Sequence, residues 1–207
     1  MKGRIDSSVK SRVGVGWFLA LVALVSLPVS GQSGGEEPGA GSFLVASRSL
    51  IDPNFDQTVI LLLDYNEKGA MGLIINRPTE VRLGEMVSDL EGVEERPETV
   101  WVGGPVAHWQ MIVLIRSEAT LADTEKVLED VLFTGSREVL EGVLESNTEF
   151  RAYAGYAGWG AGQLDNEIDR GSWHVLPGDP ELVFDPTPHE LWRELLSRGE
   201  SQWASLQ

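Results

Sequence analysis

The sequence predicts a mixed α/β fold, in which one compact domain has a central, largely buried mixed sheet and helices packed on it as a sandwich. Three observations lead to this prediction. Apolar runs of strand length recur along the chain, and they alternate with segments whose apolar residues are spaced as on one face of a helix. The chain has 207 residues, of which 42% are hydrophobic and 23% charged, which suits a single globular domain.

Most of the expected strands lie in the first half of the chain. Residues 43–46 form a short apolar segment that predicts a strand. Residues 58–63 and 71–76 are continuous apolar runs, so both strands should be buried. Only residues 64–70 separate them, which favours antiparallel pairing, and Pro78 should end the second strand because it cannot donate to a ladder. Further buried strands are expected at residues 100–102, 111–115 and 150–156.

Three helices are expected from apolar spacing and from capping residues. Apolar side chains within residues 83–90 have helical spacing and predict a short amphipathic helix. Ser136 is a suitable N-cap for a second helix, whose apolar face lies within residues 139–144. Residues 187–190 form a capping box with Pro188 at the first helical position. The helix that follows should bury Leu191, Trp192, Leu195 and Leu196.

The N-terminal 31 residues have the layout of a secretory signal peptide. A basic segment precedes residues 13–29, which carry no charge, and Val29 and Gly31 provide small residues before a cleavage point near Gly31/Gln32. The alternatives are an uncleaved inner-membrane anchor and a cytoplasmic start at a later methionine. We expect an exported, periplasmic protein with a signal peptide (1–31), a disordered tether (32–41), one domain (42–200) and a short tail (201–207).

The balance of charge excludes several classes of partner. The formal net charge is −16, and removal of residues 1–31 leaves 12 basic and 31 acidic residues, a net charge of −19. Nucleic acid is therefore not an expected partner, and contact with a membrane is expected only through the N-terminal segment if that segment is not cleaved. The chain has no cysteine, and His108, His174 and His189 show no ligand-like spacing, so no metal or cofactor is expected.

The most distinctive segment is residues 155–167, where four glycines alternate with Tyr156 and Trp159 and lead into Gln163 and Glu167. Glycine at this density is kept where the backbone needs a positive φ or a close approach. Large aromatic side chains beside it require burial. The segment therefore predicts a packed turn that leads into a helix.

Several blocks, in the same order along the chain, resemble the YqgE/AlgH family of bacterial proteins. The resemblance implies a similar α/β sandwich, and members are commonly labelled transcriptional regulators although no biochemical activity is settled. This chain has Tyr65 and Ile115 at two positions where relatives carry histidine, which argues against shared histidine chemistry. The matching blocks are residues 52–55, 69–78, 103–106, 136–140, 155–167, 172–173 and 191–193.

These blocks contain the candidate ligand-binding residues, each with a structural alternative. Asn76 and Arg77 lie at the end of a buried strand, where α/β sheets often bind ligands, so both could contact a ligand. Alternatively, Asn76 forms hydrogen bonds within a turn and Arg77 forms an ion pair with a carboxylate. Gly103 and Gly104 could direct backbone N–H groups at an anion, or form a tight turn between strands. The last group could form a cradle that binds a phosphate or similar anion at a helix N-terminus, or it could allow the turn to pack closely against the sheet. This group consists of Gly158, Trp159, Gly162 and Gln163.

Three functions remain open on the sequence alone. The first is a non-catalytic domain that binds a protein or a small ligand outside the cytoplasm, because no nucleophile or metal site is assembled. The second is a transcriptional regulator, as the family label suggests. The third is a hydrolase that uses carboxylates near the glycine segment, such as Glu167. No residue is assigned as catalytic.

Overall fold

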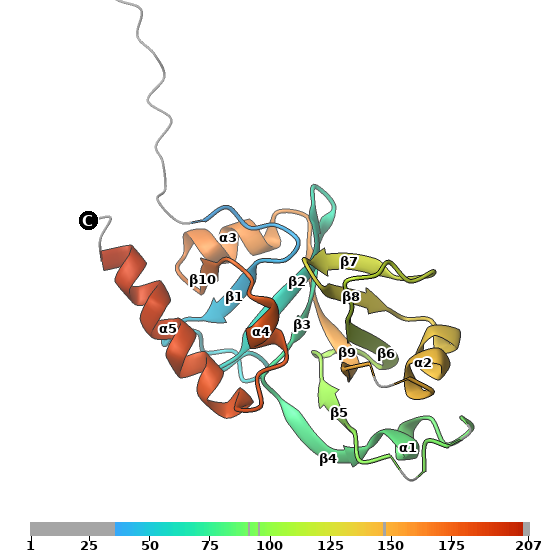
Figure 1. Ribbon diagram of the computed structural model, residues 1–207. Coiled ribbons are helices and arrows are strands. Elements are labelled where there is room, and N and C mark those ends of the chain that lie inside the picture. Colours follow the sequence, from blue (N-terminus) through green and yellow to red (C-terminus); the bar gives the residue numbers. More distant parts are fainter. Residues whose placement is uncertain (1–35, 91, 95, 147, 205–207) are drawn as a thin grey trace, which may run out of the picture. The chain divides into compact units, whose positions relative to one another are not determined.

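The computed structural model describes residues 36–90, 92–94, 96–146 and 148–204. The expected signal peptide lies outside these residues. The described strands form one ten-stranded sheet in the order β10-β1-β2-β3-β9-β6-β8-β7, and β4 and β5 join it beside β9 (Figure 1). The strands are β1 (Phe43–Ala46), β2 (Val59–Asn66), β3 (Gly69–Ile74), β4 (Pro78–Arg82), β5 (Thr99–Val102), β6 (Val106–Arg116), β7 (Glu125–Leu128), β8 (Val131–Thr134), β9 (Phe150–Gly160) and β10 (Trp173–Leu176).

Strand β9 connects the two parts of this sheet. Its C-terminal half pairs with β3, from Ala157↔Gly72 to Gly160↔Gly69. Its N-terminal half pairs antiparallel with β6 and parallel with β5. The sheet is therefore mixed, as predicted, although the β5–β9 pair is the only parallel one among the described strands.

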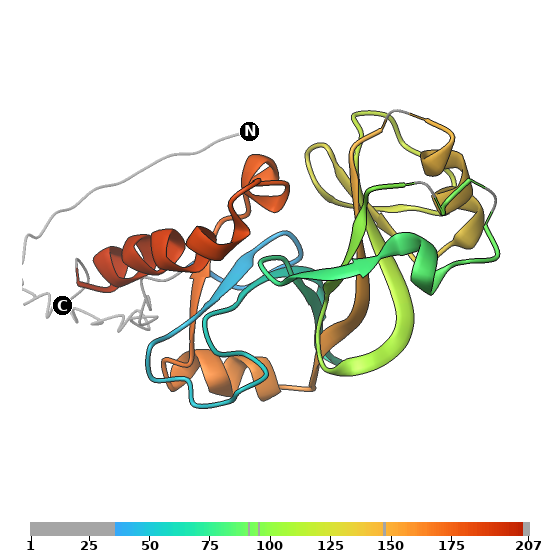
Figure 2. The same cartoon turned by 90° about the horizontal axis from the view of Figure 1, so that it is seen from below.

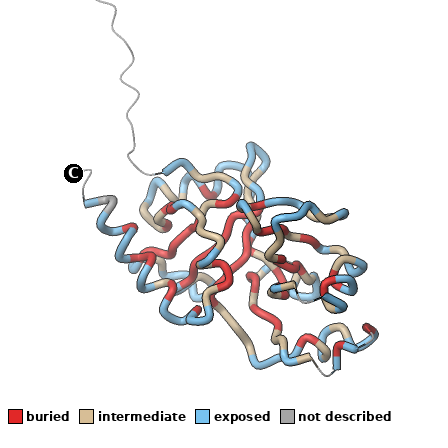
Figure 3. The backbone as a smooth tube through the Cα atoms, viewed as in Figure 1, coloured by how far each residue is buried: buried red, intermediate tan, exposed pale blue. Residues whose placement is uncertain are grey.

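Helices cover both faces of the β10-β1-β2-β3 part, and their sequences explain where they form. Alternate residues of β1 face opposite sides: Phe43 and Val45 pack with the helix at the C-terminus, and Leu44 and Ala46 pack with Leu164. Figure 2 shows the helices α5 and α3 on these two sides. The buried residues follow the strands, and α5 alternates buried and exposed positions (Figure 3). The helices are α1 (Leu83–Met86), α2 (Arg137–Leu144), α3 (Gln163–Asp169), α4 (Pro180–Val183) and α5 (Pro188–Ala204).

The predicted fold class is confirmed, and most predicted elements form. The β2–β3 hairpin is antiparallel. The N-cap of α2 forms as expected, with the hydroxyl of Ser136 accepting a hydrogen bond from the backbone N–H of Val139 (3.3 Å). Helix α5 buries Leu191, Leu195 and Leu196 as expected, whereas Trp192 is only partly buried. The helix continues to Ala204, beyond the expected domain end.

Several sequence predictions differ from the structure. The glycine segment is not a turn from residue 155 onward, because β9 continues to Gly160 and the turn is confined to residues 161–162. Gly103 and Gly104 do not form a simple tight turn between neighbouring strands, because the chain crosses β9 there and β5 and β6 lie on either side of it. The helix expected over residues 83–90 is a single turn. At α5 the hydroxyl of Thr187 contacts Asp185 instead of completing a capping box. Strands β4, β7, β8 and β10 and helix α4 were not predicted.

Candidate functional site

Three aromatic side chains from separate sequence blocks pack together beside α3. The ring of Phe55 stacks on Trp159, with centroids 6.2 Å apart and an interplanar angle of 18°. Trp173 meets both rings edge-on, at 5.7 Å from Phe55 and 6.0 Å from Trp159. Trp159 and Trp173 are almost fully buried. Such offset and edge-on contacts are the favoured arrangements for aromatic rings. We refer to Phe55, Trp159 and Trp173 as the aromatic cluster.

The carboxylate of Glu167 holds both tryptophans of the aromatic cluster. Its Oε2 accepts hydrogen bonds from the indole N–H groups of Trp159 (2.9 Å) and Trp173 (2.8 Å). Its Oε1 accepts from Nε2 of Gln163 (3.0 Å), which lies one turn earlier on α3. The amide oxygen of Gln163 in turn accepts from the backbone N–H of Gly160 (3.1 Å). These hydrogen bonds connect helix α3 to strand β9. The carboxylate of Glu167 accepts hydrogen bonds from three donors in all.

Asn76 and Arg77 shape the loop that carries Phe55. The side chain of Asn76 is buried; it accepts from the N–H of Val59 (2.9 Å) and donates to the carbonyl of Gln57 (2.9 Å). The guanidinium of Arg77 donates to the carbonyls of residues 54 (2.6 Å) and 56 (2.9 Å), on either side of Phe55. Burial lowers the pKa of Arg77. These two side chains therefore fix the position of Phe55 on the aromatic cluster.

Gly103 and Gly104 lie where the chain crosses β9. A Cβ on Gly103 would lie 2.2 Å from the carbonyl oxygen of Gly155, and one on Gly104 would lie 2.1 Å from the carbonyl carbon of Tyr156. The N–H of Gly103 donates to Ala154, and its carbonyl accepts from the N–H of Ile74 (both 2.9 Å). These glycines allow two backbones to cross in contact, and the N–H of Gly103 is already engaged.

The structure brings some of the predicted site residues together and separates others. Trp159 and Gln163 belong to the aromatic cluster and its supports, and Asn76 and Arg77 reach it through the loop. Gly103 borders Leu73, which belongs to a different hydrophobic cluster from that of Trp159. Gly158 and Gly162 are exposed; Gly162 precedes α3 with φ +67°.

Sequence reasoning missed two residues of the site. Phe55 and Trp173 were recognised as parts of matching blocks but not as neighbours of Trp159. Their positions in such blocks were the signal that could have identified them. A further contact, from the hydroxyl of Tyr65 to the carboxylate of Asp165 (2.5 Å), joins residues 100 apart in sequence, and no sequence signal predicts it. This hydrogen bond raises the pKa of Tyr65 to about 12.

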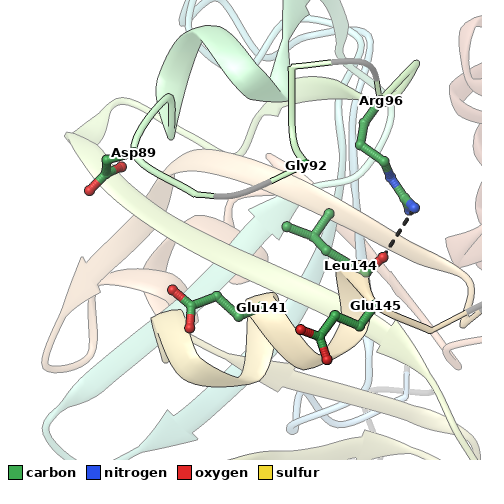
Figure 4. A pocket seen from close by; sticks show the side chains of 6 residues that line it. All are labelled: Asp89, Gly92, Arg96, Glu141, Leu144 and Glu145. Carbon is green, nitrogen blue, oxygen red and sulfur yellow. Dashed lines mark hydrogen bonds between the residues drawn. The ribbon is translucent and has the colours of Figure 1, made fainter.

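A cavity of about 430 Å³ lies between α2 and the segment after α1. Three carboxylates line it, and the guanidinium of Arg96 donates to the carbonyl of Leu144 (3.1 Å) at its edge (Figure 4). Its residues belong to other elements than the aromatic cluster, so it is a separate feature. The lining residues are Asp89, Gly92, Arg96, Glu141, Leu144 and Glu145.

The described residues offer neither a cluster of metal ligands nor a membrane-spanning helix. Within residues 36–90, 92–94, 96–146 and 148–204, no three histidine or acidic side chains are grouped so as to hold a metal ion. None of the helices in this part of the chain is both long enough and apolar enough to span a bilayer.

Comparison with known proteins confirms the family resemblance that the matching blocks indicated. Residues 43–204 match the model of the AlgH-like family. The chain belongs to the YqgE/AlgH family. A UPF0301 protein of Streptomyces coelicolor is 36% identical over 172 residues, covering 79% of this chain and 88% of that protein. A UPF0301 protein of Idiomarina loihiensis is 36% identical over 158 residues, covering 73% and 85%.

Two solved structures share the fold of this chain. The solution structure of AlgH from Pseudomonas aeruginosa aligns with a TM-score of 0.66 at 32% identity, covering 79% of this chain and 92% of AlgH. A crystal structure of a protein from Corynebacterium diphtheriae aligns with a TM-score of 0.69, and at 22% identity it supports the fold alone. The biochemical function of the family is uncharacterised, so the relatives do not supply an activity.

Proposed function

We propose that this YqgE/AlgH family protein is a non-catalytic binding domain that acts outside the cytoplasm. The observation that carries the proposal is the engagement of Glu167. Its carboxylate receives three hydrogen bonds from Trp159, Trp173 and Gln163, so it supports the shape of the protein. A general acid or base needs instead to reach a substrate proton within hydrogen-bond distance.

The supports around the aromatic cluster favour the same proposal. The polar groups of Asn76 and Arg77 form hydrogen bonds with the backbone of residues 54–59. These hydrogen bonds hold a surface loop in one conformation. A surface that is already ordered loses less conformational entropy when a partner binds to it, which favours binding. The occupant is an unknown protein or small ligand, and neither a cofactor nor a catalytic residue forms part of the proposal.

The enzymatic alternative has a direct test. The purified protein is screened against panels of ester, amide, phosphate and glycoside substrates, together with Glu167→Gln, Asn76→Ala and Gln163→Ala. We expect no turnover above that of a heat-denatured sample. Turnover by the wild-type protein that Glu167→Gln abolishes, while the variant remains folded by circular dichroism, would replace the binding domain with a carboxylate-dependent hydrolase.

The proposed location rests on the sequence of residues 1–31. Fractionation of expressing cells, followed by intact-mass analysis, determines where the mature chain begins. We expect a periplasmic species that starts near Gln32. A full-length species in the membrane fraction would indicate a tethered domain. A soluble cytoplasmic species that starts downstream would contradict export and would return attention to the regulator label.

The regulator alternative faces an electrostatic objection. A formal net charge of −16 repels a phosphate backbone at long range, and affinity for DNA depends largely on phosphate contacts. We therefore expect no binding of mixed-sequence or genomic DNA at physiological salt in an electrophoretic mobility assay. Retardation that weakens steeply as salt is added would support the regulator alternative.

A further inference from the structure

The N-terminal half of β6 contains a large bulge that faces a single residue of β9. Val106 pairs with Tyr156, and the next pair is Met111 with Ala154. Residues 107–110 of β6 therefore all stand opposite Gly155. Bulges of this kind redirect side chains and are often placed where function requires it.

The bulge is pressed closely onto β9. Gly155 has φ +71°, and a Cβ there would lie 2.8 Å from the carbonyl oxygen of Val106 and 3.4 Å from Cα of His108. Only glycine fits this contact without a shift of the backbone. On the bulge itself, Ala107 has φ +48°, a conformation that costs an L-residue free energy. Both strands are thus adapted to the bulge.

The bulge exposes an indole ring to solvent. Trp109 is 85% exposed, and its N–H makes no hydrogen bond to any residue in the described part of the chain. In contrast, the indole N–H groups of Trp159, Trp173 and Trp192 all have acceptors. Tryptophan is among the residues that contribute most to binding energy at protein interfaces.

A partly apolar face of the sheet adjoins the base of the bulge. A Cβ on Gly158 would lie 3.2 Å from the ring of Tyr156 and 3.8 Å from Val106, so these three residues are contiguous. Gly158 pairs with Met71, which pairs with Asp64, and cross-strand partners lie on the same face. The face therefore runs from the base of the bulge to an exposed carboxylate on β2. We call this face, together with Trp109, the Trp109 surface.

We propose that the Trp109 surface binds a basic polypeptide, which places an arginine or lysine side chain on the exposed indole. This inference rests on the proposed binding function; it assigns the contact with the partner to the Trp109 surface rather than to the loop of the aromatic cluster, and it names the chemistry of the partner. Residues 106–111 carry no formal charge, but the chain as a whole has 32 acidic and 16 basic residues. An exposed apolar surface on a chain with this excess of negative charge complements a basic partner, and cations stack favourably on tryptophan.

The same charge argues against a second copy of the chain as the occupant. Two molecules that each carry −16 repel one another when they approach. No opposite charge is available on the bulge to offset this repulsion, because residues 106–111 lack Lys and Arg. Self-association through this surface is therefore the less favourable arrangement.

Photo-cross-linking of the full chain in cells of the source organism tests the proposal. A benzophenone amino acid is introduced at position 109 or, as a matched control, at position 51, because Ile51 is 92% exposed in the loop of the aromatic cluster. We expect one discrete adduct from position 109 and none from position 51. Mass spectrometry should identify the partner as a protein with net positive charge.

Binding of the purified partner then provides the decisive measurement. Trp109→Ala should weaken the affinity about tenfold or more, while Ile51→Ala changes it less than about twofold. Added salt should weaken the wild-type complex. An adduct of two copies of this chain, an acidic partner, or no adduct at position 109 would each overturn the proposal. An adduct at position 51 alone would overturn it and leave the binding function standing, whereas substrate turnover would overturn that function itself.

Discussion

Glu167 shows how a single side chain organises the aromatic cluster. A neutral amide at this position can accept from the indoles with its oxygen, but its NH₂ group then faces the NH₂ group of Gln163. The hydrogen bond from Gln163 to a charged acceptor is lost, and two donors oppose each other. We therefore expect Glu167→Gln to lower the free energy of unfolding by about 1–3 kcal/mol.

Urea unfolding followed by tryptophan fluorescence measures this change. Glu80→Gln is a suitable control, because Glu80 is exposed and makes no side-chain hydrogen bond or ion pair within the described residues. The control should change the free energy of unfolding by less than about 0.5 kcal/mol. Equal effects of the two substitutions would mean that the carboxylate of Glu167 does not support the cluster.

Tyr65 gives a prediction that depends on pH. Its hydroxyl donates to Asp165, and this hydrogen bond raises its pKa to about 12. An unfolded chain has a tyrosine pKa of about 10. The folded state thus holds the proton more tightly. The stabilisation is complete below about pH 10 and is lost as the pH rises toward about 12.

A titration of tyrosinate absorbance tests this assignment. Tyr65→Phe should remove a component near pH 12 from the folded protein. Asp165→Asn should leave the component but move it to lower pH, since the carboxylate acceptor is absent. A titration curve that Tyr65→Phe leaves unchanged above about pH 11 would show that the hydrogen bond is not formed in solution.

At the scale of elements, the sequence predicted those features that depend on residues close together in the chain. Ser136 caps α2 through contacts within four residues, so its sequence was sufficient. Strands β2 and β3 pair across a short turn and were predicted for the same reason. The prediction failed at β9, because Gly155 and Gly158 suggested a turn. Both are accommodated in a strand by neighbours distant in sequence, Val106 and Met71, which the local sequence cannot indicate.

The candidate site follows the same division. Asn76, Arg77, Trp159 and Gln163 could be singled out because they stand in recognisable blocks. Their contacts could not be predicted, since Phe55 meets Trp159 across about a hundred residues of sequence and only the sheet brings them together. The roles of Asn76 and Arg77 in holding a loop follow from backbone carbonyls that no sequence pattern marks.

The crossing over β9 yields a prediction at this scale. Gly104→Ala would place a Cβ 2.1 Å from the carbonyl carbon of Tyr156, so the crossing strands must separate. We expect a loss of about 3 kcal/mol or more in the free energy of unfolding, or no folded protein. Gly142→Ala is the matched control, because a Cβ on this helical residue meets nothing within 4 Å. It should stabilise the protein by about 0.5–1 kcal/mol.

Thermal unfolding monitored by circular dichroism compares the two alanine variants. The two substitutions should change the stability in opposite directions. Gly104 lies where two backbones cross in contact, whereas a Cβ on Gly142 in α2 meets no other atom within 4 Å. A Gly104→Ala protein as stable as the wild type would show that β9 and the segment before β6 are not in contact in solution.

At the scale of the whole molecule, net charge affects stability as well as partner choice. Arg116 illustrates the imbalance: one guanidinium faces Asp130, Glu149 and Glu181, at 3.3, 2.9 and 2.7 Å. Even this dense cluster of ion pairs contains more negative than positive charge. Added salt screens both the attractions and the repulsions between such groups.

The larger of these two effects determines the response to salt. In half of the eight ion pairs of the described residues both side chains are substantially exposed, and each such pair contributes at most about 1 kcal/mol. The repulsion arises from an excess of 16 negative charges confined to one small chain. We therefore expect the free energy of unfolding to rise when sodium chloride is increased from low to physiological ionic strength. Urea serves as the denaturant, because guanidinium would itself add salt. If stability instead falls with salt, the ion pairs outweigh the repulsion, and the acidic surface is better organised internally than its net charge indicates.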